Sequence, residues 1–259
     1  MNNIEIRGLV VRTTDIRESD RLITIFSEEV GLVSAMARGA RSLKSRKMSS
    51  TMQFCYSSFV LYKHGEHYQI KECELIESFF GLHNSIEGLA LATYITEVIS
   101  DVAVAQPEPE LLRLALNSLY AISENKYELS KIKAAFEIRT ASIIGFMPEV
   151  LECSVCGEKS GEFYFEIMSG AIKCYSCKEK MALTNPEPEN PHETQAVCLL
   201  SEGAKIALGY CIYSPLAKIF SFRISESDMS LFSRACEEYL LNHLERSFNS
   251  LDFYKEVAR

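Results

Sequence analysis

The sequence predicts an α+β protein of several parts: a small β-barrel first, a helical domain after it, and a metal-bound insertion within the helical part. Up to about residue 80, short segments are rich in β-branched and aromatic residues, and beyond Leu82 the apolar period lengthens to about 3.6 residues. Two Cys-x-x-Cys pairs then lie in the middle of the helical part. We therefore expect three parts: a barrel domain over residues 1–80, a helical domain over 81–150 and 183–259, and a four-cysteine insertion over 151–182.

The composition is that of an ordinary folded chain. The 259 residues are 47% hydrophobic and 24% charged, which excludes disorder as the default state and leaves ample sequence for a core. Thr93, Thr96, Glu97 and Asp101 interrupt the most apolar helical stretch, residues 89–105, so no segment is long enough to span a membrane. The first residues lack the basic-then-apolar pattern of a secretory signal. We expect a cytoplasmic protein with no membrane partner.

Five segments of the first part are predicted to be strands because they alternate with polar or glycine-containing breaks. They cover residues 4–13, 21–27, 32–38, 55–62 and 67–76. The break at residues 28–31 has the length of a hairpin loop, in which Gly31 would supply a positive backbone angle. Five short antiparallel strands leave long edges unless the sheet closes, so a small barrel is favoured, and an SH3-like barrel also fits the pattern.

Helical periodicity predicts five helices. They cover residues 84–105, 110–123, 129–146, 201–213 and 226–248. Asn84 with Glu87 resembles a capping box at the start of the first helix, and Pro148 limits the third. A loop is predicted at 183–194, which holds three prolines among acidic residues. The last helix carries an apolar stripe that we interpret as facing the core instead of a partner. The stripe is Phe232, Cys236, Tyr239, Leu240 and Leu244.

The cysteines point to a metal site. Nine is an odd count, and in a reducing compartment cysteines indicate thiols and metal ligands before disulfides. Cys153 with Cys156 and Cys174 with Cys177 form two Cys-x-x-Cys turns, with 17 residues between the turns. Each turn directs two thiolates at one point, so the spacing predicts one Zn²⁺ held by all four. Because four thiolates close the tetrahedron, this zinc would be structural.

The residues around the two pairs agree with a ribbon-like insertion. Gly157 permits a tight turn after the first pair, and the apolar segment 163–167 suits a hairpin that carries the second pair back. The competing interpretation is that the four are unrelated buried cysteines, which the spacing disfavours. The five isolated cysteines are expected to fill core positions as small hydrophobes. They are Cys55, Cys73, Cys198, Cys211 and Cys236.

The sequence contains no set of residues that matches a known catalytic motif in full. His64-Gly65-Glu66 matches the His-x-Glu half of the nucleic-acid deaminase motif, and Cys153 with Cys156 could supply the other half. However, no proline precedes Cys153, and the second cysteine pair would have no role. Neither a phosphate-binding glycine loop nor a zinc-protease helix motif occurs. We predict that the protein is not an enzyme and has no catalytic residues.

One segment is electrostatically distinct. The chain carries 27 basic and 35 acidic residues, a net charge of −8, yet residues 30–65 include no Asp or Glu. Most of the positive charge of this segment lies in one stretch, which we call the basic loop. Its cations are Arg38, Arg41, Lys44, Arg46 and Lys47. Such side chains, interleaved with serines and Gly39, neutralise phosphates irrespective of base sequence. The sequence thus predicts nucleic-acid binding here.

Unstacked bases would need aromatic faces as well as cations. Candidates lie on the following strands. They are Tyr56, Phe59, Tyr62 and Tyr68. The competing interpretation of the basic loop is a solvated charge run. The acidic remainder of the chain favours binding, because it would confine a polyanion to this one patch.

The order of the motifs resembles the RecO family of DNA repair proteins along nearly the whole chain. The early motifs are VRTTDIRESDRLITIF from Val11, GLVS from Gly31 and RGARSLKS from Arg38. Later come GFMP from Gly145, the two cysteine pairs, Leu200-Ser201 at a helix start, and a final motif, YLLNHLER, near the end. The joint order of these motifs is more specific than any one of them.

The resemblance implies an oligonucleotide-binding (OB) fold for the barrel, a helical domain, a zinc insertion and no turnover chemistry. It implies a recombination mediator that binds single- and double-stranded DNA, anneals strands, and contacts single-stranded-DNA-binding protein. It also implies work with RecR, and in some members RecF, to load RecA. The five cations match the family's basic loop and the four cysteines its metal ligands, and the expected location is the cytoplasm, at the nucleoid. The alternative is a zinc-stabilised scaffold that joins proteins without touching nucleic acid.

Overall fold

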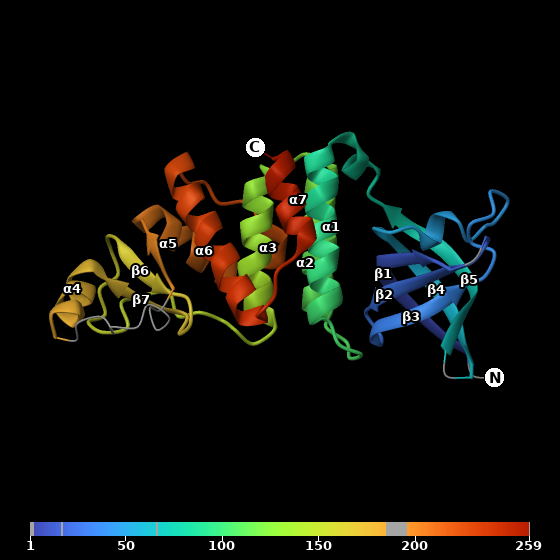
Figure 1. Ribbon diagram of the computed structural model, residues 1–259, viewed down its shortest axis with the longest axis horizontal. Helices are drawn as coiled ribbons and strands as arrows, with labels where there is room; N and C mark the ends of the chain where they lie inside the picture. The colour runs from blue at the N-terminus through green and yellow to red at the C-terminus, as the bar shows by residue number, and fades with distance from the viewer. Residues whose placement is uncertain (1–2, 17, 66, 185–195, 259) are drawn as a thin grey trace. The chain divides into compact units, whose positions relative to one another are not determined.

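The first five strands lie where the sequence predicts them. The computed structural model describes residues 3–16, 18–65, 67–184 and 196–258 (Figure 1). The strands are β1 (Asn3–Asp15), β2 (Arg21–Ser27), β3 (Gly31–Ala37), β4 (Cys55–His64) and β5 (His67–Ser78). They form a closed barrel in the order β1-β2-β3-β5-β4. This order is that of the five-stranded Greek-key OB barrel, so the predicted barrel is confirmed, and the SH3-like alternative is wrong.

The barrel closes because β1 is long enough to pair with two neighbours. Its first half, from Asn3 to Leu9, pairs antiparallel with β4, and its second half, from Gly8 to Asp15, pairs with β2. A Cβ at Gly8 would lie 2.7 Å from the carbonyl oxygen of Phe26, so only glycine allows β1 to pass this close to β2. The remaining seam is a short parallel pairing between β3 and β5.

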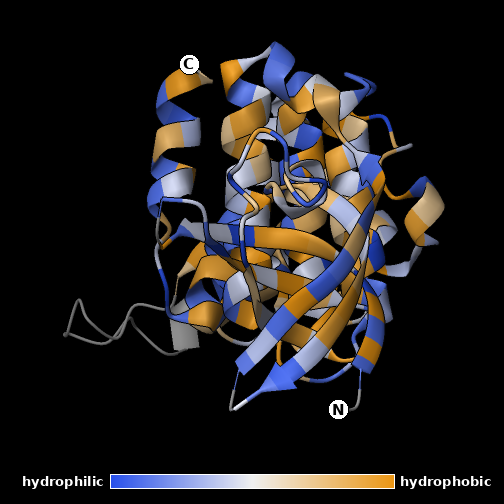
Figure 2. Cartoon of the chain, turned by 90° about the vertical axis from the view of Figure 1, so that its right-hand side faces the viewer, coloured by the Kyte–Doolittle hydropathy of each residue, from blue (hydrophilic) through white to orange (hydrophobic). Residues whose placement is uncertain are grey.

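Alternation of side chains builds the core of the barrel. Inward-facing residues of all five strands are buried, while their neighbours face outward, and Figure 2 shows apolar and polar residues alternating along these strands. The core is Ile6, Val10, Ile23, Ile25, Ala35, Ala37, Ala40, Phe59, Leu61 and Ile70. The β2–β3 turn has Gly31 at a φ of +70°, as predicted for the hairpin.

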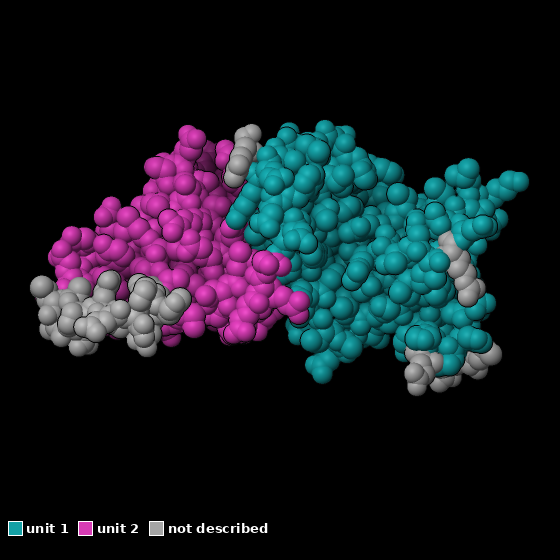
Figure 3. Space-filling view, viewed as in Figure 1, with its two compact units in different colours: residues 1–126, 248–259 teal, residues 127–247 magenta. Residues whose placement is uncertain are grey.

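The chain divides into two compact units, residues 1–126 with 248–259 and residues 127–247 (Figure 3). The first unit adds helices α1 (Ile86–Val102), α2 (Pro109–Ser123) and α7 (Asn249–Val257) to the barrel, with short 3-10 turns η1 (Ser49–Thr51) and η2 (Phe80–Asn84). The predicted Asn84 and Glu87 capping box is wrong. Asn84 ends η2, and the extended residue Ser85 caps α1 by accepting a hydrogen bond from the Gly88 amide.

The second unit contains α3 (Leu129–Ile143), α5 (Glu202–Tyr213), η4 (Leu216–Lys218) and α6 (Glu226–Leu244). Helix α3 ends before the predicted residue 146, because Gly145 adopts a φ of +104°. The predicted helix at 226–248 ends early, at Leu244, because Glu245 turns left-handed after α6, and α7, which starts at Asn249 in the first unit, is not in the prediction. The α6 stripe faces the core as predicted, with Phe232, Cys236, Tyr239 and Leu240 buried and Leu244 half-buried.

The cysteine-containing region folds as a small sheet. Strands β6 (Phe163–Glu166), β7 (Ala171–Cys174) and β8 (Val197–Leu200) pair in the order β7-β6-β8, and α4 (Tyr175–Thr184) follows β7. The predicted hairpin between the cysteine pairs is confirmed, whereas β8 and α4 are not in the prediction. Of the predicted loop at 183–194, the first two residues end α4 and the rest lie outside the described residues. No helix in the described ranges is both long and apolar enough to cross a membrane.

Candidate nucleic-acid interface and metal centre

The basic loop connects β3 to η1 and displays its cations to solvent. Arg38, Arg41, Lys44 and Arg46 are exposed and Lys47 is half-buried. The backbone between them runs through successive tight turns: the Ser45 amide donates to the Ser42 carbonyl at 2.8 Å and the Ser42 amide donates to the Gly39 carbonyl at 3.3 Å. The loop holds a defined shape without burying its charges.

The start of the loop is fixed to the connection between β1 and β2. The Gly39 amide donates to Asp20 Oδ1 at 2.9 Å, and the Arg41 amide donates to the Ser19 carbonyl at 3.0 Å. The guanidinium of Arg41 adds an ion pair, with 3.1 Å from Nε to Asp15 Oδ2. These contacts hold the positively charged side chains at one end of the barrel.

The five cations differ in how they are held. Lys47 Nζ donates to the Ile70 carbonyl at 2.7 Å, and Arg41 pairs with Asp15. Within the described part of the chain, Arg38, Lys44 and Arg46 make no ion pair. A surface groove of about 1020 Å³ is lined by Arg46 and Lys47 together with four carboxylates. The carboxylates are those of Glu5, Glu29, Glu72 and Glu74. The exposed positive charge is therefore centred on Arg38 to Arg46.

The four aromatic candidates for base stacking differ in their burial and in their hydrogen-bond partners. Phe59 is 1% exposed inside the barrel core and cannot stack on a base. The Tyr62 hydroxyl donates to Gln69 Oε1 at 2.7 Å, and the Tyr56 hydroxyl donates to Glu28 Oε1 at 3.0 Å. Burial, followed by this bond to Glu28, raises the pKa of Tyr56 to about 12. Tyr68 packs on the barrel core with one side and reaches the surface with the other.

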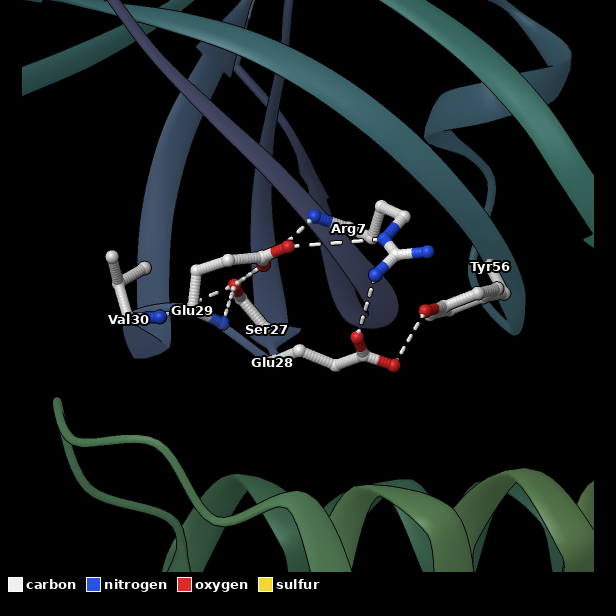
Figure 4. Close-up of polar contacts among 6 residues, drawn as sticks. All are labelled: Arg7, Ser27, Glu28, Glu29, Val30 and Tyr56. Atoms are coloured by element: carbon white, nitrogen blue, oxygen red, sulfur yellow. Dashed lines mark hydrogen bonds and ion pairs between the residues drawn. The ribbon is translucent and has the colours of Figure 1, made fainter.

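A network at the β2–β3 turn neutralises another cation. Arg7 pairs with Glu28 at 3.1 Å, while its backbone amide donates to Glu29 Oε2 at 2.9 Å (Figure 4). The Ser27 hydroxyl donates to the same Glu29 oxygen at 2.8 Å. Since two carboxylates surround Arg7, this residue of the barrel offers no net positive charge to a phosphate. The network instead ties the turn to β1.

The four predicted metal ligands meet at one point. The Sγ atoms of Cys153, Cys156, Cys174 and Cys177 all lie within 4.8 Å of one another. Cys153 and Cys156 lie on a turn closed by the Gly157 amide, which donates to the Cys153 carbonyl at 2.9 Å. Gly157 has a φ of +77°, as the tight turn requires. Cys174 ends β7 and Cys177 lies in the first turn of α4, so the hairpin brings the second pair to the first.

The chemistry of this cluster suits a cation. Burial raises the pKa of the Cys153 thiol, but backbone amides of Cys174, Cys156 and Val155 donate to it and bring its pKa down to about 6. Hydrogen bonds with Cys156 and Cys174, followed by burial, instead raise the pKa of Cys177 to about 12. Four thiolates at this spacing repel one another, and a divalent metal ion would stabilise all four at once. The cluster can therefore hold a structural metal ion.

The isolated cysteines behave differently. Cys55, Cys198, Cys211 and Cys236 are buried, as predicted for core positions, and Cys73 is half-buried. Burial raises the pKa of Cys55 to about 11, so this thiol stays protonated at neutral pH. Of the deaminase-like residues, His64 ends β4, Cys153 joins the four-cysteine cluster, and Glu66 lies outside the described residues.

A five-stranded OB barrel, followed by helices and a four-cysteine cluster, places the chain among multidomain OB-fold proteins. Comparison with known families makes this specific. The model for the N terminal part of Recombination protein O matches residues 1–79, and that for its C terminal part matches residues 83–252. The chain belongs to the RecO family of DNA repair and recombination proteins.

Individual relatives agree with the family match. DNA repair protein RecO of Acetivibrio thermocellus is 35% identical over 261 residues, which cover 100% of this chain and 99% of that protein. DNA repair protein RecO of Thermoanaerobacter sp. is 26% identical, with 99% of each chain covered. The RecO protein of Listeria monocytogenes serotype 4b is 32% identical over 184 residues, or 71% of this chain and 72% of that protein.

Proposed function

We propose that this chain is a DNA-binding recombination mediator that anneals single strands. The observation that carries the proposal is the basic loop: a cluster of exposed cations, held at one end of an OB barrel, on a chain with a net charge of −8. The cations that contact DNA are those that the sequence predicts. They are Arg38, Arg41, Lys44, Arg46 and Lys47. Both single- and double-stranded DNA present the phosphates that such a loop binds.

Annealing needs no catalytic group. Two DNA strands repel each other through their phosphates, and a protein that neutralises phosphates while leaving base edges free lowers the barrier to their encounter. Base pairing itself supplies the sequence information. The protein would then act by binding and release and not as an enzyme.

Membership of the RecO family supports the rest of the assignment. The proposed partners are single-stranded-DNA-binding protein, RecR and, in some settings, RecF, and the proposed outcome is the loading of RecA onto single-stranded DNA. These partners act on chromosomal DNA, which would place the protein at the nucleoid in the cytoplasm. We assign DNA binding to residues 1–80. Residues 81–150 with 183–259 would support the barrel and offer surfaces to protein partners.

The four-cysteine cluster within residues 151–182 would hold one structural zinc ion. Four sulfur ligands in a closed tetrahedral arrangement are the ligand set that structural zinc prefers. Cys153, Cys156, Cys174 and Cys177 would be its ligands, and the ion would hold together a sheet too small to have a large core of its own.

The experiment that tests DNA binding is a salt titration of single-stranded DNA affinity. Five neutralised phosphates give a slope of log affinity against log salt of about −3.5, and the three cations without ion pairs alone give about −2.1. A slope in this range supports the proposal. A slope near zero would show that the basic loop does not contact phosphates.

Charge reversal separates the mediator from the protein-scaffold alternative. Replacing Arg41, Lys44 and Arg46 with Glu should abolish DNA binding and strand annealing while pulldown of the protein partners stays intact. A scaffold that does not touch DNA would be unaffected in both assays. Loss of both DNA binding and partner binding in a folded variant would contradict the separation of the two surfaces.

A further inference from the structure

A cavity opens on the barrel surface beside Arg38, the first cation of the basic loop. Unlike the loop, which is charged, the cavity is largely apolar. Its volume is about 610 Å³, within the usual range for small-molecule sites, and much of its lining is apolar. The side chains of Ile16, Leu22 and Met36 supply the apolar part, and 46% of Ile16 is exposed. An exposed apolar hollow of this size suits an occupant with an apolar face.

The rest of the lining includes three rings and a cation, besides Asp20, Ser34 and Gln69. Tyr68, His64 and His67 border the cavity, and Arg38 of the basic loop borders it as well. Aromatic rings and a guanidinium plane are the groups on which unpaired bases stack. The one carboxylate among the described lining residues, Asp20, accepts the Gly39 amide and disfavours a phosphate inside the cavity. The lining thus suits a flat, uncharged group inside and a phosphate at Arg38.

The place of the cavity in the fold points to the same ligand. Its residues come from the β1–β2 connection, from β2 and β3, from the last residue of β4 and from the start of β5. In OB barrels oligonucleotides lie on the face of the second and third strands, beside the loops that join strands 1 to 2 and 4 to 5. The short parallel pairing of β3 with β5, Ala35 with Tyr68 and Met36 with Gln69, brings the ring of Tyr68 to this face.

We propose that this cavity binds one unstacked base of single-stranded DNA, held between Tyr68, His67 and the apolar residues, while Arg38 contacts the adjoining phosphate. The inference rests on the proposed DNA-binding function and adds to it a site that contacts a base. It makes the protein prefer strands whose bases are unpaired. The cations of the basic loop alone would bind any phosphate chain equally.

The test compares two oligonucleotides with equal charge: a 15-nucleotide oligothymidylate and a chain of the same length whose sugars lack bases. Fluorescence anisotropy gives the affinity of the full chain for each. One stacked base contributes a factor of about 5 to 150 in affinity, so the oligothymidylate should bind more tightly by that factor. Equal affinities, with the salt slope retained, would overturn the base pocket and leave the proposed DNA-binding function standing. Absence of binding to both would overturn the two together.

Two variants test whether the base contacts the proposed rings. Tyr68→Leu and His67→Ala should each weaken oligothymidylate binding at least 5-fold while leaving the base-free chain unaffected. His67 is exposed, so its removal leaves the barrel core intact if Tyr68→Leu destabilises the fold. Tyr120→Leu is the control, because Tyr120 is an exposed tyrosine on α2 of the same unit that does not line the cavity. Unchanged oligothymidylate affinity in the His67 variant and in any folded Tyr68 variant would overturn the proposal.

A covalent readout is independent of affinity. An oligonucleotide carrying 5-iodouracil forms a crosslink on ultraviolet irradiation with a ring that touches the base. Peptide mapping should place the adduct on His67 or Tyr68. An adduct confined to other barrel residues, or loss of a protein partner with no loss of DNA in the Tyr68→Leu variant, would identify the cavity as something other than a base site.

Discussion

The guanidinium of Arg41 lies 3.1 Å from the carboxylate of Asp15, so one cation of the basic loop is paired with an acid of the barrel. Asp15 also pairs with Arg21, at 3.0 Å from Nε to Oδ1. The carboxylate is half exposed, where an ion pair is weak and easily exchanged for another anion. A DNA phosphate would therefore compete with Asp15 for Arg41.

Removal of this competing acid should strengthen DNA binding. In Asp15→Asn, Arg41 loses its carboxylate partner, so we expect severalfold tighter binding of single-stranded DNA and a salt slope steeper by about 0.7. Anisotropy titrations at several salt concentrations measure both. Glu124→Gln is the control, since Glu124 is an exposed acid at the end of α2. Equal gains in both variants would show that only net charge matters.

The four-cysteine cluster should stabilise the second unit and not the barrel. Chelation or Cys177→Ser should remove the proposed zinc ion and open the small sheet, because ligand binding and local folding are coupled. Limited proteolysis should then cut within residues 151–182, while DNA affinity, which depends on the other unit, changes little. Cys73→Ser, on the barrel, should resist proteolysis like the unmodified chain. Unchanged proteolysis after confirmed metal loss would contradict a structural role.

Lys133 forms a buried charge network in the second unit. It is 3% exposed and lies 2.8 Å from Glu137, its neighbour on α3, and 2.7 Å from Glu237 on α6. Burial lowers the pKa of Lys133, but the two carboxylates outweigh it and raise the pKa overall. Lys133→Met would leave Glu137 buried without its cation, so we expect a loss of about 3–5 kcal/mol in urea unfolding.

A second variant separates charge from packing at this network. Lys133→Met combined with Glu137→Leu should recover most of that loss, because the double variant removes both charges of the buried pair on α3. If the double variant is as unstable as the single one, packing and not charge accounts for the effect.

Asp228 should make the second unit sensitive to acid. Its carboxylate accepts hydrogen bonds from the hydroxyls of Ser201, at 2.5 Å, and Ser225, at 2.7 Å, which cap α5 and α6. These bonds lower the pKa of Asp228 below its ordinary value. Its stabilising contribution is therefore present above about pH 4 and is lost as the pH falls through the lowered pKa.

The measurement compares unfolding free energies between pH 6 and pH 2.5. Asp228→Asn should be less stable than the unmodified chain at pH 6, and the difference should shrink toward acid pH. Glu226→Gln, which changes an exposed acid in the same helical turn, should show no such trend. A constant difference at all pH values would contradict the assigned role of the Asp228 charge.

Two glycines with similar backbone angles should respond differently to alanine. Gly31 and Gly39 have φ values of +70° and +67°. A Cβ at Gly31 would lie 2.1 Å from the Gln106 carbonyl oxygen, whereas one at Gly39 would meet nothing within 4 Å. We expect Gly39→Ala to cost about 1 kcal/mol and Gly31→Ala clearly more, measured by thermal or urea unfolding. Equal losses of stability in the two variants would show that the positive φ, and not the clash with Gln106, sets the cost of alanine.

Much of the fold follows from local patterns. The five barrel strands match their predicted segments within a few residues, because alternation and turn residues decide strand position locally. Helix ends proved harder. Asn84 and Ser85 are both good capping residues, and the backbone at η2 decides between them. The early end of the helix predicted at 226–248 depends on Glu245 taking a left-handed conformation, which its side chain does not signal.

The candidate sites, like the fold, include features that local sequence predicts and features that it does not. The cysteine spacing predicts a cluster that the structure brings together, because each Cys-x-x-Cys turn is a local unit. The basic loop is visible as a charge run, but its pairing with Asp15 joins residues far apart in the chain. Phe59 and Tyr68 look alike in sequence, and only the barrel register places one inside and the other at the surface.

Because α7 belongs to the first unit but follows the second unit in the chain, folding of the first unit depends on the order of synthesis. It packs on α1, where the rings of Tyr94 and Phe248 meet edge to face at 5.7 Å and Ser250 bonds to Glu97. The ribosome must therefore release all of residues 127–247 before α1 can gain this neighbour. The first unit therefore completes its packing only after the whole of the second unit has been synthesised.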